Sequence, residues 1–242
     1  MITSVDNQRV KDVVRLRKSR ERRRTGLFVA EGRREVERAA AAGLTIHATY
    51  FAPALIEWPT GEEVSERVLA KMAYRSEPEG VIAVVEAPQR ALPKNGTLYL
   101  VCVGIEKPGN LGAMARTAEA AGADALVVAE AQADLFNPNA IRASTGAVFT
   151  LPVVEATIDE VRALDAQLLA ATVDATRAHT DVDLTTPTAF AVGAEDEGLD
   201  GRWRAAADRH VVIPMPGAGG TDSLNAATAA AILLFEAMRQ RA

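Results

Sequence analysis

Cysteine is almost absent from this chain of 242 residues, which contains only Cys102. One cysteine cannot form a disulfide within the chain, so the natural compartment is a reducing cytoplasm. No basic, apolar, cleavable leader opens the sequence, and no apolar run approaches the roughly 20 residues that span a bilayer. We therefore expect a cytoplasmic protein that has no membrane partner.

Signals for metals and for common nucleotide cofactors are also missing. The chain has three histidines, and they do not cluster with Cys102 at the spacing of metal ligands, so no metal is expected. No G-x-G-x-x-G fingerprint opens the helix expected after Gly104, and no G-x-x-x-x-G-K-S/T phosphate loop occurs there. These absences argue against a nucleotide-binding α/β enzyme of another class.

The net charge of −5 is distributed unevenly along the chain. Residues 9–38 hold 12 Lys/Arg and 5 Asp/Glu, whereas the rest of the chain holds 15 Lys/Arg and 27 Asp/Glu. Residues 20–24 include four arginines, which repel one another unless an anion binds. The pattern favours a basic N-terminal face for nucleic acid, with a solvated, salt-bridged helix surface as the alternative.

The first part of the chain has the pattern of a small α/β unit. Its apolar spacing predicts helices and strands in alternation, and this implies a sheet with helices beside it. The expected helices are 8–16, 33–42 and 64–72, and the expected strands are 27–30, 45–51 and 81–86. Residues 87–96, with two prolines and a glycine, are typical of a linker. We therefore expect a domain over residues 1–90, a linker over 91–96 and a second domain over 97–242.

The second part alternates more regularly between apolar strands and helices. Its continuously apolar strands predict a parallel sheet covered on both faces. The expected strands are 98–105, 125–128, 168–172, 189–193 and 210–213, and the expected helices are 111–121, 158–165 and 224–239. Ligands of such sheets collect at the carboxyl ends of the strands, which directs attention to the loops there.

Three of these loops carry candidate functional residues. In the first, residues 104–118, a Pro-Gly turn leads to Asn110 as a helix cap, and Arg116 could point back over the loop. In the second, residues 193–198, Glu195 lies between two glycines. In the third, the glycines at 217, 219 and 220 offer backbone groups to a small ligand before Ser223 and Asn225. Taken singly, each has a plain alternative: a close-packed helix with a surface arginine, an acidic turn, and a capped helix.

In order and composition, the three loops resemble those of the SpoU/TrmH-type RNA ribose 2′-O-methyltransferases of the SPOUT superfamily. The matching residues of the loops are Asn110, Gly112, residues 116–118 and Gly122, then residues 193–199, then residues 213–215 and 223–225 with Ala229 and Glu236. A lesser match covers residues 141–147 with Phe149 and Pro152. The N-terminal part is similar to a substrate-binding domain that often precedes this catalytic domain. It matches at residues 2–4, Asn7, Lys11, Arg20, Arg24, Phe28, residues 31–32 and residues 75–85.

The resemblance implies an α/β fold with a C-terminal parallel-sheet SPOUT domain that contains a deep trefoil knot. A small α/β domain resembling a ribosomal protein and binding the RNA substrate precedes it. The resemblance further implies a homodimer whose active sites form at the interface. Two departures from the family occur: Ala226-Ala227 stands where Val-Ser is usual, and residues 216–222 are about two residues longer than common.

The implied reaction is methyl transfer from S-adenosylmethionine to a ribose 2′-hydroxyl of RNA, with ribosomal RNA favoured over transfer RNA. A non-catalytic RNA-binding protein on the same scaffold is the alternative. The sulfonium methyl is already activated, so catalysis needs positioning, a proton acceptor and stabilisation of the developing oxyanion. Arg116 is expected to grip phosphate and stabilise the alkoxide, and a general-base role is the open alternative. Glu195 is expected to orient Arg116 or hold a group of the partner chain.

The residues that the resemblance assigns fall into three sets. The catalytic set is Asn110, Arg116, Glu195, Ser223 and Asn225. The cofactor-binding set is Thr172, Val173, Gly193, Ala194, Glu195, Gly198, Ile213, Met215, Ser223 and Leu224. The RNA-binding set is Arg20, Arg22, Arg23, Arg24, Arg33 and Arg142.

Overall fold

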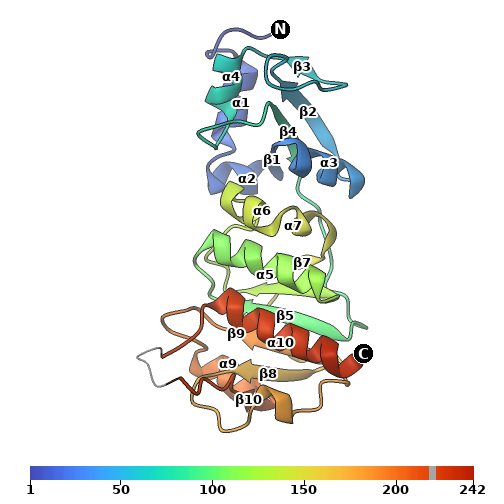
Figure 1. Cartoon of the computed structure of the whole chain (residues 1–242), viewed down its shortest axis with the longest axis vertical. Coiled ribbons are helices and arrows are strands. Elements are labelled where there is room, and N and C mark those ends of the chain that lie inside the picture. Colours follow the sequence, from blue (N-terminus) through green and yellow to red (C-terminus); the bar gives the residue numbers. More distant parts are fainter. Residues whose placement is uncertain (218–221) are drawn as a thin grey trace. The chain divides into compact units, whose positions relative to one another are not determined.

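The computed structural model describes residues 1–217 and 222–242 (Figure 1). They form two compact units. Unit 1 consists of residues 1–89 together with residues 134–149, and unit 2 consists of residues 90–133 and 150–242. Unit 1 therefore includes a segment from the middle of the chain.

Unit 1 contains a four-stranded sheet in the order β1-β4-β2-β3. The strands are β1 (Leu27–Glu31), β4 (Val81–Glu86), β2 (Ile46–Phe51) and β3 (Glu62–Glu63). β4 pairs antiparallel with β1 and β2, and the short β3 pairs parallel with β2. The helices from the N-terminal part are α1 (Gln8–Arg15), α2 (Ser19–Thr25), α3 (Arg33–Ala41) and α4 (Glu66–Met72). Val10, Val13 and Leu69 bring α1 and α4 into one apolar core.

The segment of residues 134–149 completes unit 1 with α6 (Pro138–Ser144) and most of α7 (Ala147–Thr150). The ring of Phe28 in β1 stacks on Phe136 at 4.7 Å and on Phe149 at 5.6 Å between ring centroids. Phe28 is fully buried, so these stacked rings remove a large apolar area from water. The aromatic stack therefore attaches the segment to the strand that begins the sheet.

Unit 2 contains a six-stranded sheet in the order β10-β8-β9-β5-β6-β7. Its strands are β5 (Leu98–Val103), β6 (Ala125–Ala129), β7 (Val153–Glu155), β8 (Gln167–Ala171), β9 (Thr188–Val192) and β10 (Arg209–Val211). Every neighbouring pair is parallel, which confirms the expected sheet type. The order reverses between β5 and β9, and ligands of open parallel sheets bind near such a reversal.

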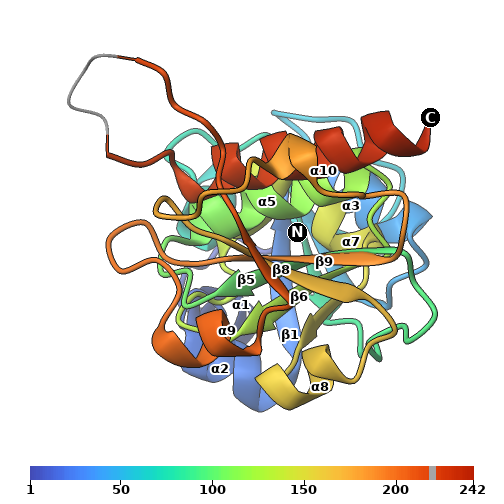
Figure 2. The ribbon, with the colours of Figure 1, turned by 90° about the horizontal axis from the view of Figure 1, so that it is seen from below.

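Helices cover both faces of this sheet (Figure 2). α5 (Pro108–Ala120) and α10 (Ala226–Arg241) lie side by side on one face, and α8 (Ile158–Arg162) and α9 (Gly201–Ala206) lie on the other. The alternation of side chains along β5 explains the two layers. Tyr99 and Val101 share a core with Trp203 of α9, whereas Cys102 points the other way and meets Met114 of α5.

No helix in residues 1–217 or 222–242 is long and apolar enough to cross a membrane. A short 3-10 helix, η1 (His179–Asp181), precedes β9. The trefoil knot stays a prediction from the family resemblance.

Candidate active site

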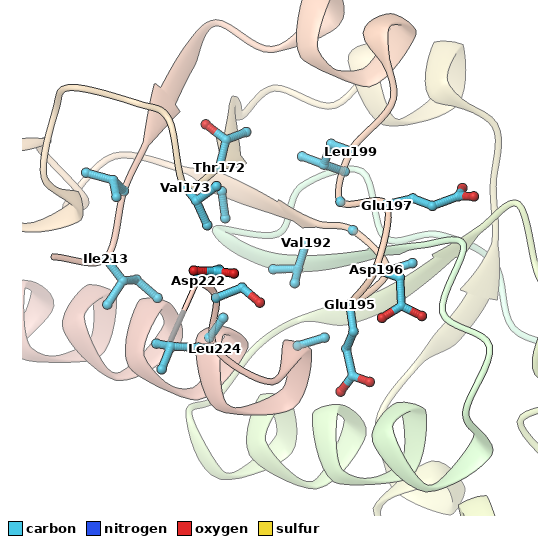
Figure 3. A pocket seen from close by; sticks show the side chains of 18 of the residues that line it. Thr172, Val173, Val192, Glu195, Asp196, Glu197, Leu199, Ile213, Asp222 and Leu224 are labelled. Carbon is cyan, nitrogen blue, oxygen red and sulfur yellow. The ribbon is translucent and has the colours of Figure 1, made fainter. Parts of the chain in front are cut away.

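A cavity of about 340 Å³ opens at the carboxyl ends of β8, β9 and β10 (Figure 3). Residues 171–173 line it from the end of β8, residues 192–199 from the end of β9, and residues 211–213 from β10. Residues 222–224 and the start of α10 close the remaining side. The volume is that of a typical small-molecule site.

All ten residues that the sequence assigned to the cofactor line this cavity. The sequence-based assignment omitted several other lining residues, among them Val192, Leu199, Arg204, Asp222, Ala226 and Ala229. Their types carry no signal of their own, because isolated apolar and charged residues occur throughout the chain. Residues 218–221, which include Gly219, Gly220 and Thr221 of the glycine loop, lie outside the described residues.

The loop after β9 folds back on itself. The backbone N–H of Gly198 donates to the carbonyl of Ala194 at 2.9 Å, and Gly198 has a positive φ of 65°. A Cβ added to Gly193 would lie 2.1 Å from the Gly198 carbonyl oxygen. Glycine at 193 therefore permits a close approach of two backbone segments that no other residue allows.

Glu195 joins the ends of three loops through its carboxylate. Asn110 Nδ2 donates to Glu195 Oε1 at 2.8 Å, and Asn225 Nδ2 donates to the same oxygen. Lys107 Nζ donates to Oε2 and forms an ion pair with Glu195. Asn225 Nδ2 also donates to Asn110 Oδ1 at 3.4 Å. The structure thus brings together three of the five residues assigned to catalysis.

The hydrogen bond from Lys107 lowers the pKa of the Glu195 carboxyl, and the Asn110 and Asn225 amides add to the effect. The same contact raises the pKa of the Lys107 ammonium. Both side chains are therefore charged at neutral pH. A carboxylate with a lowered pKa is a weak general base, so Glu195 is suited to hold its neighbours in place. Sequence reasoning did not identify Lys107 as a site residue.

The position of Asn110 corrects one expectation. Helix α5 begins at Pro108 after Lys107, which provides no side-chain cap, so Asn110 does not cap the helix. It lies in the first turn instead, where its amide can reach Glu195. Asn225 does cap α10: its Oδ1 accepts from Ala227 N at 3.0 Å and from Thr228 N at 3.3 Å. Asn225 therefore serves both as a cap and as a ligand of Glu195.

Arg116 lies apart from this group. It is exposed on α5 and lines neither the large cavity nor the smaller one of about 90 Å³ beside Lys107 and Asn110. The Glu195 carboxylate accepts from Lys107, Asn110 and Asn225, and no hydrogen bond or ion pair joins it to Arg116 among the described residues. A role of Glu195 in orienting Arg116 or in holding a group of the partner chain stays a prediction. Ser223 is exposed and lines the large cavity.

Five of the six arginines assigned to RNA are exposed, namely Arg20, Arg23, Arg24, Arg33 and Arg142. Arg24 pairs with Glu21 at 2.9 Å, and Arg33 pairs with Glu37 at 3.2 Å.

Arg22 requires a correction. It is 5% exposed, and its Nε and Nη2 donate to Asp134 Oδ2 at 2.9 and 2.6 Å. Its Nη1 donates to the carbonyls of Leu16 and Arg17. This guanidinium is occupied inside unit 1, so we remove Arg22 from the RNA-contacting set.

A model of the SpoU rRNA methylase family matches residues 97–235, which is more than half of the chain. The chain belongs to the SpoU rRNA methylase family. Residues 7–83 match a second model, an MRM3-like substrate-binding domain. The family that the sequence motifs indicated is thereby confirmed.

Relatives of this SpoU-family chain are similar over nearly its whole length. The 23S rRNA (uridine(2479)-2′-O)-methyltransferase of Streptomyces viridochromogenes is 33% identical, over 91% of this chain and 85% of the relative. A crystal structure of an RNA 2′-O ribose methyltransferase is 41% identical with a TM-score of 0.86, over 99% of this chain and 98% of the other. An AdoMet-bound rRNA methyltransferase from Sinorhizobium meliloti is 30% identical with a TM-score of 0.88, over 98% and 97% of the two chains.

Proposed function

We propose that this protein transfers the methyl group of S-adenosylmethionine to a ribose 2′-hydroxyl of ribosomal RNA. The observation that carries the proposal is the cavity at the ends of β8, β9 and β10 in this chain of the SpoU family. All ten residues assigned to the methyl donor line this cavity. A similar structure holds AdoMet, and a relative acts on 23S rRNA.

S-adenosylmethionine supplies an activated methyl on its sulfonium when it is bound. The residues of this chain supply binding and orientation. Gly193 and Gly198 let the loop of residues 193–198 fold back on itself, and the folded loop forms one wall of the cavity for the donor. The Asn110, Glu195 and Asn225 group fixes the loop ends at the mouth of the cavity, and this limits the geometries available to the incoming ribose.

Arg116 is assigned to the phosphate and the developing alkoxide of the substrate. A guanidinium stays protonated at neutral pH, which supports a stabilising role over a general-base role. Arg116 does not line the cavity of its own chain, which supports a homodimer in which Arg116 serves the other copy. Phe235 and Met238 on α10 are each 41% exposed, and such exposed apolar side chains support a protein partner on this helix.

Unit 1 is assigned to RNA binding, with Arg20, Arg23, Arg24, Arg33 and Arg142 as candidate phosphate contacts. The match of residues 7–83 to a substrate-binding domain supports this role. We also propose that residues 1–90 form the substrate-binding domain and residues 97–242 the catalytic domain. The proposed place of action is the cytoplasm.

The direct test is incubation of the purified protein with S-adenosylmethionine labelled on its methyl group and with total rRNA or total tRNA. We expect label in rRNA that resists alkaline cleavage, as a 2′-O-methylated linkage does. Label only in tRNA would support the transfer RNA alternative. RNA binding without any calorimetric signal for S-adenosylmethionine would overturn the proposal and favour a non-catalytic RNA-binding protein.

A further inference from the structure

A second cavity, of about 180 Å³, lies within unit 1 and has no assigned role. Its wall is formed by the end of β1, by residues 74–76 and by α6. The lining residues that matter most are Val29, Tyr74, Arg75, Pro138, Ile141 and Arg142. We propose that this cavity receives one unstacked nucleotide of the RNA substrate, an inference that rests on the proposed function.

Tyr74 is exposed and yet held in place. Tyr74 is 48% exposed, and its hydroxyl accepts a hydrogen bond from Asn139 Nδ2 at 3.2 Å. Its backbone N–H donates to Glu31 Oε2 at 2.8 Å. An exposed aromatic ring fixed at both ends has little conformational entropy left to lose on binding. Single-stranded RNA is recognised by stacking its bases on rings of this kind.

The acidic groups of the cavity already have partners. Glu31 accepts the backbone N–H groups of Tyr74 and Arg75, and Glu35 pairs with Arg34 at 2.7 Å and with Arg75 at 3.7 Å. Glu35 Oε2, however, is buried and accepts no hydrogen bond among the described residues, so this oxygen can accept from an amino or hydroxyl group of a bound nucleotide. No group of three His, Cys, Asp or Glu side chains that could hold a metal occurs in residues 1–217 and 222–242.

Arg142 supplies a positive charge at the cavity. It is exposed on α6, and across the described part of the chain no carboxylate pairs with it. A guanidinium is well shaped for phosphate, and it can also stack on a base.

The apolar residues in the wall favour a nucleotide over a free phosphate as the ligand of the cavity. Val29, Pro138 and Ile141 give the cavity an apolar side that a phosphate alone would not use. Ser76 and Asn139 add polar groups that can meet the edge of a base. The combination of a fixed aromatic ring, an apolar wall, polar edges and an unpaired arginine matches a base together with its phosphate.

The first experiment measures the affinity of the full-length protein for a 23S rRNA transcript. Tyr74→Ala should weaken binding about tenfold, whereas Tyr74→Phe, which keeps the ring but loses the hydrogen bond from Asn139, should weaken it by a smaller factor. Arg142→Ala should lower the affinity and reduce the salt slope by about one. Arg67→Ala removes another exposed arginine of unit 1, one that does not line the cavity, and should have a smaller effect. Equal effects of Arg142→Ala and Arg67→Ala, with no loss in Tyr74→Ala, would overturn the inference.

The second experiment locates the nucleotide. Transcripts that contain 4-thiouridine or 6-thioguanosine are irradiated in complex with the protein, and the crosslinked peptides are identified by mass spectrometry. We expect adducts on residues 74–76 or 138–142 that disappear in Tyr74→Ala. Adducts confined to other peptides would overturn the inference even if the protein methylates rRNA. Absence of methyl transfer would instead reject the proposed function, because crosslinking does not depend on the methyl donor.

Discussion

Asn110 donates a hydrogen bond to Glu195 at 2.8 Å, although 85 residues separate the two in the chain. The contact connects the start of α5 to the loop after β9. Asn225 at the start of α10 reaches the same carboxylate oxygen, so the two helices that pack together on one face of the sheet are both tied to this loop. The positions of these loop ends relative to the donor cavity therefore depend on one carboxylate.

Glu195→Gln should lower kcat about tenfold, and Glu195→Ala about a hundredfold, because the amide retains an acceptor for one neighbour and the methyl retains none. Lys107→Met removes the cation that pairs with Glu195 and should lower kcat less than either Glu195 variant does, since both asparagine contacts can persist. Single-turnover kinetics with saturating S-adenosylmethionine measure the effect. A Glu195→Gln enzyme with wild-type kcat would remove Glu195 from the positioning role.

Gly193→Ala should abolish binding of S-adenosylmethionine, because the added Cβ would lie 2.1 Å from a backbone oxygen of the same loop. Gly201→Ala is the matched control: its Cβ would meet nothing within 4 Å, and alanine favours the helix in which it lies. Isothermal calorimetry with the donor distinguishes the two variants. Normal donor affinity in Gly193→Ala would show that the loop does not bind the donor as proposed.

Arg116→Ala should abolish methyl transfer while donor affinity stays normal, since Arg116 does not line the cavity of its own chain. If Arg116 serves the other copy of a homodimer, co-refolding equal amounts of Arg116→Ala and Gly193→Ala chains should restore about a quarter of wild-type activity, because mixed dimers keep one intact site. Activity that stays at zero in the mixture, with dimers verified by light scattering, would place Arg116 at the site of its own chain.

Arg20→Ala combined with Arg23→Ala should weaken RNA binding and reduce the salt slope by about two, with the free energy of unfolding nearly unchanged. Arg22→Ala should behave differently and lower the free energy of unfolding by about 3 kcal/mol, because it leaves Asp134 without its partner. Filter binding between low and moderate salt, together with urea denaturation, measures both quantities. A stable Arg22→Ala protein would contradict the structural role of the buried ion pair.

Glu236 on α10 should contribute to stability in a pH-dependent way. The hydrogen bonds from Arg239 and then from Gln240, both at 2.8 Å, lower the pKa of its carboxyl from 4.5 to about 2. The contribution is therefore complete above pH 4.5 and is lost as the pH falls towards 2. Glu236→Gln should cost on the order of 1 kcal/mol near pH 7 and almost nothing in strong acid. A difference in unfolding free energy that does not change with pH would contradict this account.

Five of the six strands of unit 2 could be predicted because their information is local, whereas β7 was missed because it is only three residues long and none of them is buried. Continuously apolar runs such as Leu98–Val103 can be covered only on both faces of a sheet, and the structure places them in one. Helix α2 was missed for a complementary reason. Its buried face presents Arg22, so it has no apolar period for a sequence pattern to detect.

The sequence by itself determined the parallel sheet, the three loops and the family to which they belong. Only the tertiary structure decided which polar side chains meet. Arg22 finds Asp134 across 112 residues, and Lys107 finds Glu195 across 88. Apolar periodicity repeats every two to four residues and is visible in any short window, whereas a single ion pair between distant residues leaves no period. In the basic run of residues 20–24, the structure therefore buries Arg22 in an ion pair and leaves the other three arginines exposed.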